Sequence, residues 1–208
     1  MPELVAAALN RVWSYDATAL RGPRRGSWYD LFMMLDIFSR YCPGWIVVEG
    51  QDGAVVRDWI EGVLRDAGPI AAGTLTIHAD RGSAMRSKAV SELLADLRIG
   101  RTHSRPHVSD DNAYSEAGFK TLKYAPDFPG RFGSIADARA FVDPFVDFYN
   151  HQQRHSGIGY HTPASVHFGT AGLVRAERAL VLDAAYAAHH AGTARPGPAR
   201  INPTKEVD

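Results

Sequence analysis

The sequence is short of cysteine, of net charge and of long apolar runs, and each shortage excludes a class of protein. Its one cysteine, Cys42, leaves no partner for an internal disulfide and excludes a cysteine-based zinc cluster. No uncharged apolar stretch is long enough to span a membrane and no signal peptide begins the chain, which predicts a soluble cytoplasmic protein. The 23 basic and 23 acidic residues balance, which is evidence against a uniformly basic surface but not against local basic patches.

What the sequence does have is the composition of one globular domain. Its 208 residues are 45% hydrophobic, enough to bury a substantial core, and no low-complexity block interrupts them. Cys42 is expected to be a buried, unreactive thiol. The stretch from Gly192 onward contains glycine and proline and is expected to be a flexible end.

Hydrophobic periodicity predicts an alternation of strands and helices. The run at 31–35 is continuously apolar, as in a buried central strand, and the three strands nearest the N-terminus are close enough for an antiparallel meander. Helix 54–67 presents Val55, Ile60 and Val63 on one face, and the next helix presents Val90, Leu94 and Leu97. The predicted helix 135–149 contains Pro144, which removes a backbone donor and should kink the helix or end a turn. In order, the predicted elements are strands 12–15, 31–35 and 45–48, helix 54–67, strand 74–78, a helix around 90–97, strand 102–104, and helices 112–123, 135–149 and 173–188.

Three carboxylates stand out from this pattern. Asp16 and Asp80 each follow a strand-like run, and Glu116 lies near the start of a predicted helix, separated from Asp80 by thirty-five residues. We expect Asp16 and Asp80 to project past the sheet where their strands end. Carboxylate oxygens are the ligands that Mg²⁺ and Mn²⁺ prefer, and two such ions about 4 Å apart support in-line displacement at phosphorus. The three acids therefore indicate a two-metal phosphoryl-transfer site.

The residues around the carboxylates carry a family resemblance. The motifs are WSYDAT at 13–18, LDIFSR at 35–40, HADRGS at 78–83, SDDNAYSE at 109–116, FKTLK at 119–123, Tyr149-Asn150 and Arg154-His155. In this order and spacing the chain, from about Val12 to about Gly169, resembles the catalytic core of bacterial insertion-sequence transposases. This group is related to retroviral integrases, and the nearest likeness is to the second-frame products of the insertion sequence three family.

The resemblance implies a fold, an activity and a domain division. The fold is ribonuclease H-like (α/β), with a mixed five-stranded sheet and helices on both faces. The activity is metal-dependent cleavage and strand transfer of DNA by a DDE transposase that acts as a multimer. The divisions are an N-terminal lead-in at 1–11, the catalytic core at 12–169, and a C-terminal helix and tail at 170–208. Related proteins carry an upstream DNA-recognition segment, for which residues 1–11 leave no room, so we expect a separate subunit or reading-frame partner to supply it.

The resemblance also implies roles for single residues. Asp16, Asp80 and Glu116 are the metal-binding and catalytic triad, holding two Mg²⁺ or Mn²⁺ ions when DNA is bound. The helix that carries Glu116 contacts DNA, and its lysine one turn later lies on the same face. The expected DNA-binding residues are Lys120, Lys123, Arg81, Asn112, Arg105 and Arg154.

Several alternatives stay open at the level of the sequence. Asp36 competes with Asp16 for the first position, but an antiparallel second strand would put it at the opposite end, capping a turn or pairing with Arg40. His78 is either structural or close to the site, and Arg154 either meets phosphate or braces a loop. The spacing of the histidines from His151 to His161 fits no common zinc motif.

Two other functions also stay open. A nuclease of the same fold acting on RNA–DNA hybrids shares the acidic site, although such enzymes usually carry a fourth acid. A non-catalytic transposase remnant that binds DNA or forms mixed multimers is compatible with departures from the family pattern. These departures are at Ala17, where relatives usually carry a β-branched residue, and at Asp143-Pro144.

Overall fold

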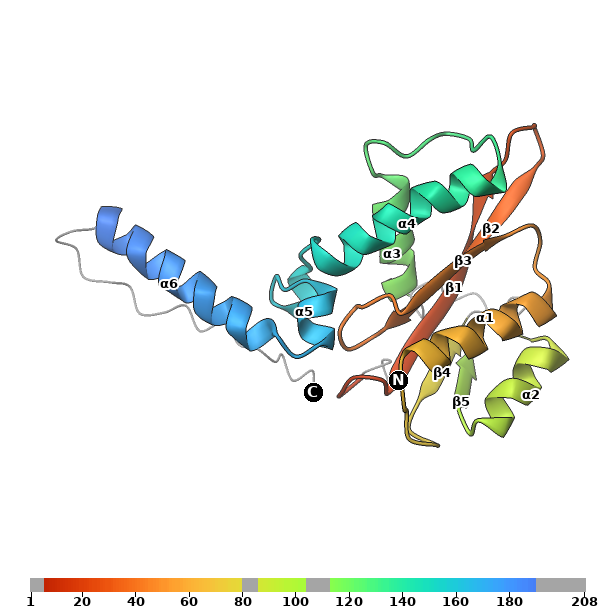
Figure 1. Ribbon diagram of the computed structural model, residues 1–208, viewed down its shortest axis with the longest axis horizontal. Helices are drawn as coiled ribbons and strands as arrows, with labels where there is room; N and C mark the ends of the chain where they lie inside the picture. The colour runs from red at the N-terminus through yellow and green to blue at the C-terminus, as the bar shows by residue number, and fades with distance from the viewer. Residues whose placement is uncertain (1–5, 80–85, 104–112, 190–208) are drawn as a thin grey trace.

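A five-stranded mixed sheet forms the centre of the protein (Figure 1). The computed structural model describes residues 6–79, 86–103 and 113–189. The strand order is β3-β2-β1-β4-β5, with β1 antiparallel to β2, β2 antiparallel to β3, and the pairs β1–β4 and β4–β5 parallel. This arrangement confirms both the predicted meander and the mixed sheet. The strands are β1 (Val12–Arg21), β2 (Trp28–Asp36), β3 (Gly44–Val48), β4 (Thr76–Ala79) and β5 (Gly100–His103).

Helices cover both faces of this sheet and bury two separate apolar clusters. On one face, side chains of β1 and β2 such as Trp13 and Phe32 pack with the first two helices; on the other, Met33 and Leu35 pack with the third and fourth. Alternate residues of one strand supply the two clusters, as the pleat of a strand requires. The helices are α1 (Gly53–Asp66), α2 (Lys88–Asp96), α3 (Ala113–Lys123), α4 (Ile135–His151), α5 (Pro163–His167) and α6 (Ala171–His189).

Helix α6 extends away from the sheet (Figure 1) and has no buried residue. Its contact with the rest of the chain includes a hydrogen bond of 2.7 Å from Arg178 Nη2 to the carbonyl oxygen of Tyr160. Neither α6 nor any other helix within the described ranges is long and apolar enough to cross a bilayer.

The strand β1 is longer than its sequence predicts. The expected strand 12–15 continues to Arg21, because β2 pairs with it at every position from Trp13↔Asp36 to Arg21↔Trp28. Residues 16–21 include little β-branched or aromatic character, so their own preference for a strand is weak. Hydrogen bonding to β2 overrides that preference, and the extra length changes where Asp16 lies.

Two further expectations about the helices are wrong. Val55 and Leu97 were expected to face the core, yet they are 39% and 42% exposed. Leu97 is the C-cap of α2, where the helical face no longer continues. The predicted helix 135–149, with Pro144 inside it, is confirmed as α4, and Val142 and Phe145 on either side of Pro144 are buried against the sheet. The short helix α5 and a 3₁₀ turn (Ser156–Ile158) were not predicted.

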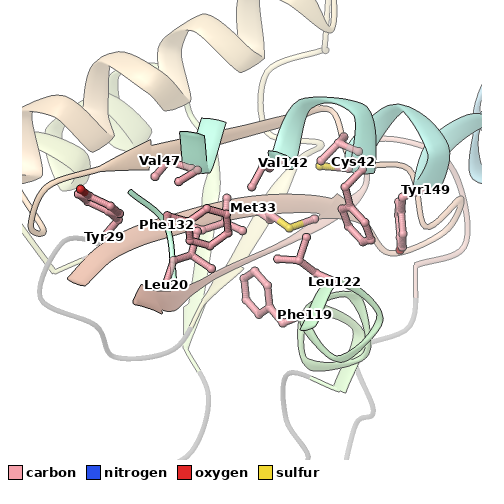
Figure 2. Packing of buried hydrophobic residues seen from close by; sticks show 14 of the residues in the cluster. Leu20, Tyr29, Met33, Cys42, Val47, Phe119, Leu122, Phe132, Val142 and Tyr149 are labelled. Carbon is pink, nitrogen blue, oxygen red and sulfur yellow. The ribbon is translucent and has the colours of Figure 1, made fainter. Parts of the chain in front are cut away.

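The cluster between the sheet and helices α3 and α4 joins distant parts of the chain (Figure 2). Leu20 and Met33 from the sheet lie close to Phe119 and Leu122 of α3, and Val142 comes from α4. Phe132, from the loop before α4, packs with Phe128 at a ring-centroid distance of 5.9 Å. This apolar layer fixes α3 against β1 and β2.

Cys42 belongs to the same cluster and is chemically protected there. Burial raises the pKa of its thiol to about 12, and its backbone is held by Asn150 of α4. Asn150 Oδ1 accepts from the Cys42 amide at 2.9 Å, and Asn150 Nδ2 donates to the Cys42 carbonyl at 3.0 Å. The expected buried thiol is confirmed.

Cys42 is therefore expected to react with a thiol reagent only after unfolding. At pH 8 a thiol with this pKa is thiolate in only about one molecule in 10⁴, and the thiolate is the reactive form. We expect the native protein to react with a chromogenic disulfide reagent at least about 100-fold more slowly than the protein in denaturant. Rapid, stoichiometric labelling of the native protein would contradict this environment for Cys42.

Candidate active site

Asp16 lies in the middle of a strand, which corrects the expectation that it ends one. It is the fifth residue of the ten in β1 and pairs with Met33 of β2. Its side chain is half-buried, and Oδ1 accepts a hydrogen bond of 2.7 Å from the Ala17 amide. Because strand side chains alternate, Ser14, Asp16 and Thr18 share one face of the sheet. The position of Asp16 therefore depends on what covers that face.

Helix α3 covers that face of β1 and is attached to it at both ends of the helix. The hydroxyls of Ser14 and Ser115 lie 2.6 Å apart and are buried. Near the other end, Lys123 Nζ donates to Thr18 Oγ1 at 2.6 Å. Asp16 lies between Ser14 and Thr18 in β1, so it occupies the stretch of strand that α3 follows.

Glu116 is brought to the same region by its place on α3. It follows the buried Ser115, and it shares a flank of the helix with Lys120 and Lys123 through the i, i+4 and i, i+7 spacing. Lys123 reaches β1 from that flank, so the flank borders the strand that carries Asp16. Glu116 is half-buried and Lys120 is exposed. They form no ion pair with each other among the described residues, so the simple surface pair that the spacing allows is not formed.

The third acid, Asp80, lies outside the described residues, as do Arg81, Arg105 and Asn112. The structure describes β4 up to Ala79, which pairs with Tyr15, the residue before Asp16. Asp16 thus lies on the face of β1 that α3 covers and Glu116 lies on α3, while the position of Asp80 stays a prediction. Within the described part of the chain, no three His, Cys, Asp or Glu side chains gather as a metal cluster.

A row of polar side chains crosses the sheet next to Asp16. Ser14, His78 and Thr102 are neighbours in register on β1, β4 and β5. His78 is buried, and its Nδ1 lies 2.9 Å from Thr102 Oγ1. His103 is also tied to the fold, with Nδ1 lying 3.3 Å from the carbonyl oxygen of Ala79. His78 therefore has a structural partner, while sharing the face that carries Asp16.

Asp36 has a structural role at the end of β2. It is fully buried, and its Oδ1 accepts from the Ser39 amide at 2.7 Å and from the Ser39 hydroxyl at 2.8 Å. Its Oδ2 accepts from the Asn10 amide at 2.8 Å. The pairing Trp13↔Asp36 puts it three positions along the sheet from the pair Asp16↔Met33. The capping role is confirmed, and these partners separate Asp36 from the site.

Arg40 does not pair with Asp36 through its side chain and instead supports the start of α3, a contact that sequence reasoning missed. Its guanidinium carbon lies 3.8 Å from the centroid of the Tyr114 ring, and Nη1 donates to the Ile37 carbonyl. Tyr114 stands two residues before Glu116. Arg40 belongs to the motif LDIFSR and Tyr114 to the motif SDDNAYSE, but nothing in either motif indicates that these two residues are in contact.

The segment from Tyr149 to His155 is mainly a brace. Tyr149 is buried and its ring packs edge-on against His155 with centroids 4.9 Å apart, while Asn150 holds Cys42. Burial, and then the charge of Arg40, lower the pKa of His155. Arg154 is exposed beyond the end of α4, and its DNA contact stays a prediction.

Two family models match this chain, and both carry the description "Integrase core domain". The first matches residues 6–109, half of the chain, and the second matches residues 97–163. Together they cover the strands, the four helices that pack on them, and the positions of all three acids.

Known transposases and integrases resemble this chain in sequence and in fold, respectively. The transposase for insertion sequence element IS904 of Lactococcus lactis is 30% identical over 159 residues, which are 76% of this chain and 61% of that protein. The chain thus spans less than two thirds of this relative. The magnesium-bound catalytic core of HTLV-2 integrase (trimeric form) superposes with a TM-score of 0.59 at 15% identity, covering 78% of this chain and 99% of that chain. The catalytic core of BIV integrase superposes with a TM-score of 0.55 at 16% sequence identity, covering 80% of this chain and 99% of that chain.

Proposed function

The chain belongs to the integrase core domain family, and from this premise we propose that it is the catalytic core of an insertion-sequence transposase that cuts and joins DNA. The observation that carries the proposal is the attachment of α3 along β1. Through this attachment, the strand that carries Asp16 packs against the helix that carries Glu116, although the two acids are one hundred positions apart in the chain. In this proposal Asp16, Asp80 and Glu116 form the catalytic triad.

The described donors suit a hard divalent cation. Asp16 and Glu116 offer carboxylate oxygens only, both are half-buried, and the neighbouring Ser14, Thr18 and Ser115 add oxygen but no sulfur. Such a donor set favours Mg²⁺ or Mn²⁺ over softer metals. Asp16, Asp80 and Glu116 would hold the ions. When bound, the ions would lower the pKa of an attacking hydroxyl and neutralise charge at the scissile phosphate.

The remaining work falls to residues that orient the DNA and the acids. Lys120 is exposed one turn after Glu116, where it can meet a phosphate of the strand that approaches the acids. Lys123 ties α3 to Thr18 and leaves further N–H donors for phosphate. Ser115 and Tyr114 hold the first turn of α3, so Glu116 is positioned before the substrate arrives. Arg81, Arg105, Asn112 and Arg154 are proposed as further DNA contacts.

The domain division and the partners belong to the same proposal. Residues 12–169 would be the catalytic unit, between the lead-in at 1–11 and the C-terminal part at 170–208. The HTLV-2 core is described in dimeric and trimeric forms, and we propose that this chain also assembles into a multimer on DNA. Recognition of the element ends would come from a separate segment or partner.

A branched DNA that mimics the joined product tests the chemistry without requiring end recognition. We expect the protein to nick and rejoin this substrate with Mn²⁺ or Mg²⁺, and Glu116→Gln to do so at least about 100-fold more slowly, because one anionic ligand is lost. Product strands resolved on a denaturing gel give the rates. A circular-dichroism melting curve for each protein provides the control for folding.

The outcomes separate the proposal from its two rivals. Metal-dependent cleavage confined to the RNA strand of a hybrid would indicate a ribonuclease H-like nuclease. A folded protein that binds the branched DNA but leaves it uncut with either metal would indicate a non-catalytic remnant. Equal rates for the wild type and Glu116→Gln would reject the triad.

A further inference from the structure

The hairpin that joins β1 to β2 carries a concentration of positive charge that the proposed site does not use. Its sequence from Arg21 to Trp28 is RGPRRGSW, in which three of eight residues are arginine and none is acidic. The hairpin forms one corner of the molecule (Figure 1). In a chain with equal numbers of acids and bases, this is a local basic surface rather than a consequence of overall charge.

The hairpin is held in a defined shape. The Gly22 amide donates to the Ser27 carbonyl at 2.9 Å, and Ser27 Oγ accepts from the Arg24 amide at 3.0 Å. Gly26 adopts φ +87°, a conformation that favours glycine. From the loop before α4, Arg131 Nη1 donates to the carbonyls of Gly22 and Arg24, each at 3.2 Å. Arg131 thus fixes the turn and adds a fourth guanidinium to it.

These four arginines are exposed and are not neutralised within the described residues. None of them is in an ion pair there, where the ion pairs lie on α1, α2 and α4. Asp30, the first acid along β2, accepts instead from Gln51 Nε2 at 3.3 Å. Arg21 lies over the ring of Trp28, 6.0 Å from its centroid, and Trp28 is 50% exposed. The hairpin therefore presents to solvent guanidinium groups that can donate hydrogen bonds to an anion.

The basic residues of the hairpin lie further along β1 from the proposed site. From Asp16, strand β1 leads past Thr18, where Lys123 is bound, to Arg21 and the turn. Five residues of strand span about 17 Å at about 3.3 Å each, which corresponds to about five base pairs of duplex at 3.4 Å each. A duplex whose scissile phosphate lies at Asp16 and Glu116 and follows β1 would reach the arginines at about that distance.

We propose that the β1–β2 hairpin, with Arg131, is a second contact surface for the phosphates of double-stranded DNA, beginning about five base pairs from the cut. The inference rests on the proposed function, because the site defines where the cut lies. The planar guanidinium group of arginine can donate two parallel hydrogen bonds to phosphate oxygens. Phosphate contacts at this distance would fix the register of the duplex on the protein without reading its sequence.

Fluorescence anisotropy with labelled branched DNAs tests the surface. One DNA has an arm of about 4 base pairs and the other an arm of about 12, so only the longer arm reaches the hairpin. For Arg24→Gln/Arg25→Gln we expect about 10-fold weaker binding of the long arm and a log–log salt slope smaller by about 2, at about 0.9 per lost phosphate contact. Binding of the short arm should be unchanged.

The matched control removes two charges elsewhere. Arg65→Gln/Lys88→Gln changes the net charge equally on α1 and α2, which cover the opposite face of the sheet. We expect this control variant to bind the long-arm and the short-arm DNA within about 2-fold of wild type, because salt screens the electrostatic effect of charges far from the bound DNA. Equal losses on both arms, an unchanged salt slope, or the same loss in the control would overturn the inference. Absence of nicking by the wild type would instead reject the proposed function, while the anisotropy series would still decide whether the hairpin binds DNA.

Discussion

Asp16→Asn is expected to lower the rate of metal-dependent nicking by about 10³-fold while leaving the fold intact. Loss of one anionic ligand removes several kcal/mol of transition-state stabilisation, and each 1.36 kcal/mol is a factor of ten. Asparagine keeps the size of the side chain and an oxygen that can accept from the Ala17 amide. Single-turnover rates on the branched substrate, at saturating protein, measure the effect.

Asp36→Asn is the informative comparison, because Asp36 is the acid that competes with Asp16 for the first position of the triad. Its buried carboxylate accepts three hydrogen bonds from Asn10 and Ser39, so amide substitution is expected to cost about 2–4 kcal/mol of folding free energy. Folded Asp36→Asn protein should nick DNA at near the wild-type rate. If this variant melts normally yet is inactive, and Asp16→Asn is active, then the first acid of the site is Asp36.

Metal binding gives a readout of Asp16 that does not depend on DNA. A ligand that binds only the native state raises the melting temperature according to its concentration and affinity. We expect millimolar Mn²⁺ to raise the melting temperature of the wild type and of Arg65→Gln/Lys88→Gln, and to have a smaller effect on Asp16→Asn. An equal rise in all three proteins would place the bound metal away from Asp16.

Trp13→Ala should destabilise the protein by about 3–5 kcal/mol, the largest effect expected from one core substitution. Trp13 is completely buried between the sheet and helices α1 and α2, and its Nε1–H donates to Asn10 Oδ1 at 3.2 Å. Alanine would leave a cavity beside Ile77 and the other side chains of that cluster. Urea unfolding followed by circular dichroism measures the loss.

Trp28→Ala provides the matched control for the same residue type. Trp28 is half exposed at the start of β2, so its removal should cost less than about 1 kcal/mol. Similar losses for Trp13→Ala and Trp28→Ala would contradict the packing of the sheet against α1 and α2. A changed slope of unfolding against urea, rather than a changed midpoint, would point to an effect on the unfolded state.

The attachment of α3 gives residues outside the proposed triad a part in positioning the site. Ser14 meets Ser115, Lys123 meets Thr18, and Arg40 lies against Tyr114. These contacts fix the first and last turns of the helix that carries Glu116. Positioning of this kind contributes to catalysis by holding reacting groups before the substrate binds.

The class of fold, the order of the strands and main helices, and the family resemblance can all be inferred from the amino-acid sequence alone. Runs such as 31–35 are apolar because a central strand is buried on both faces, and that pattern is visible in one dimension. The carboxylates could be named because their motifs are local. The chemistry they support follows from the residue type, since carboxylate oxygens bind hard cations in any fold.

How these residues meet depends on the packing of the folded chain. Sequence placed Asp16 at a strand end, but pairing with β2 extends β1 to Arg21 and leaves Asp16 beneath α3. The Arg40–Tyr114 stack joins positions 74 residues apart, and the arginine hairpin gains Arg131 from a distant loop. Such contacts depend on the packing of segments far apart in the chain, and local periodicity carries no record of which distant segment will cover a given face.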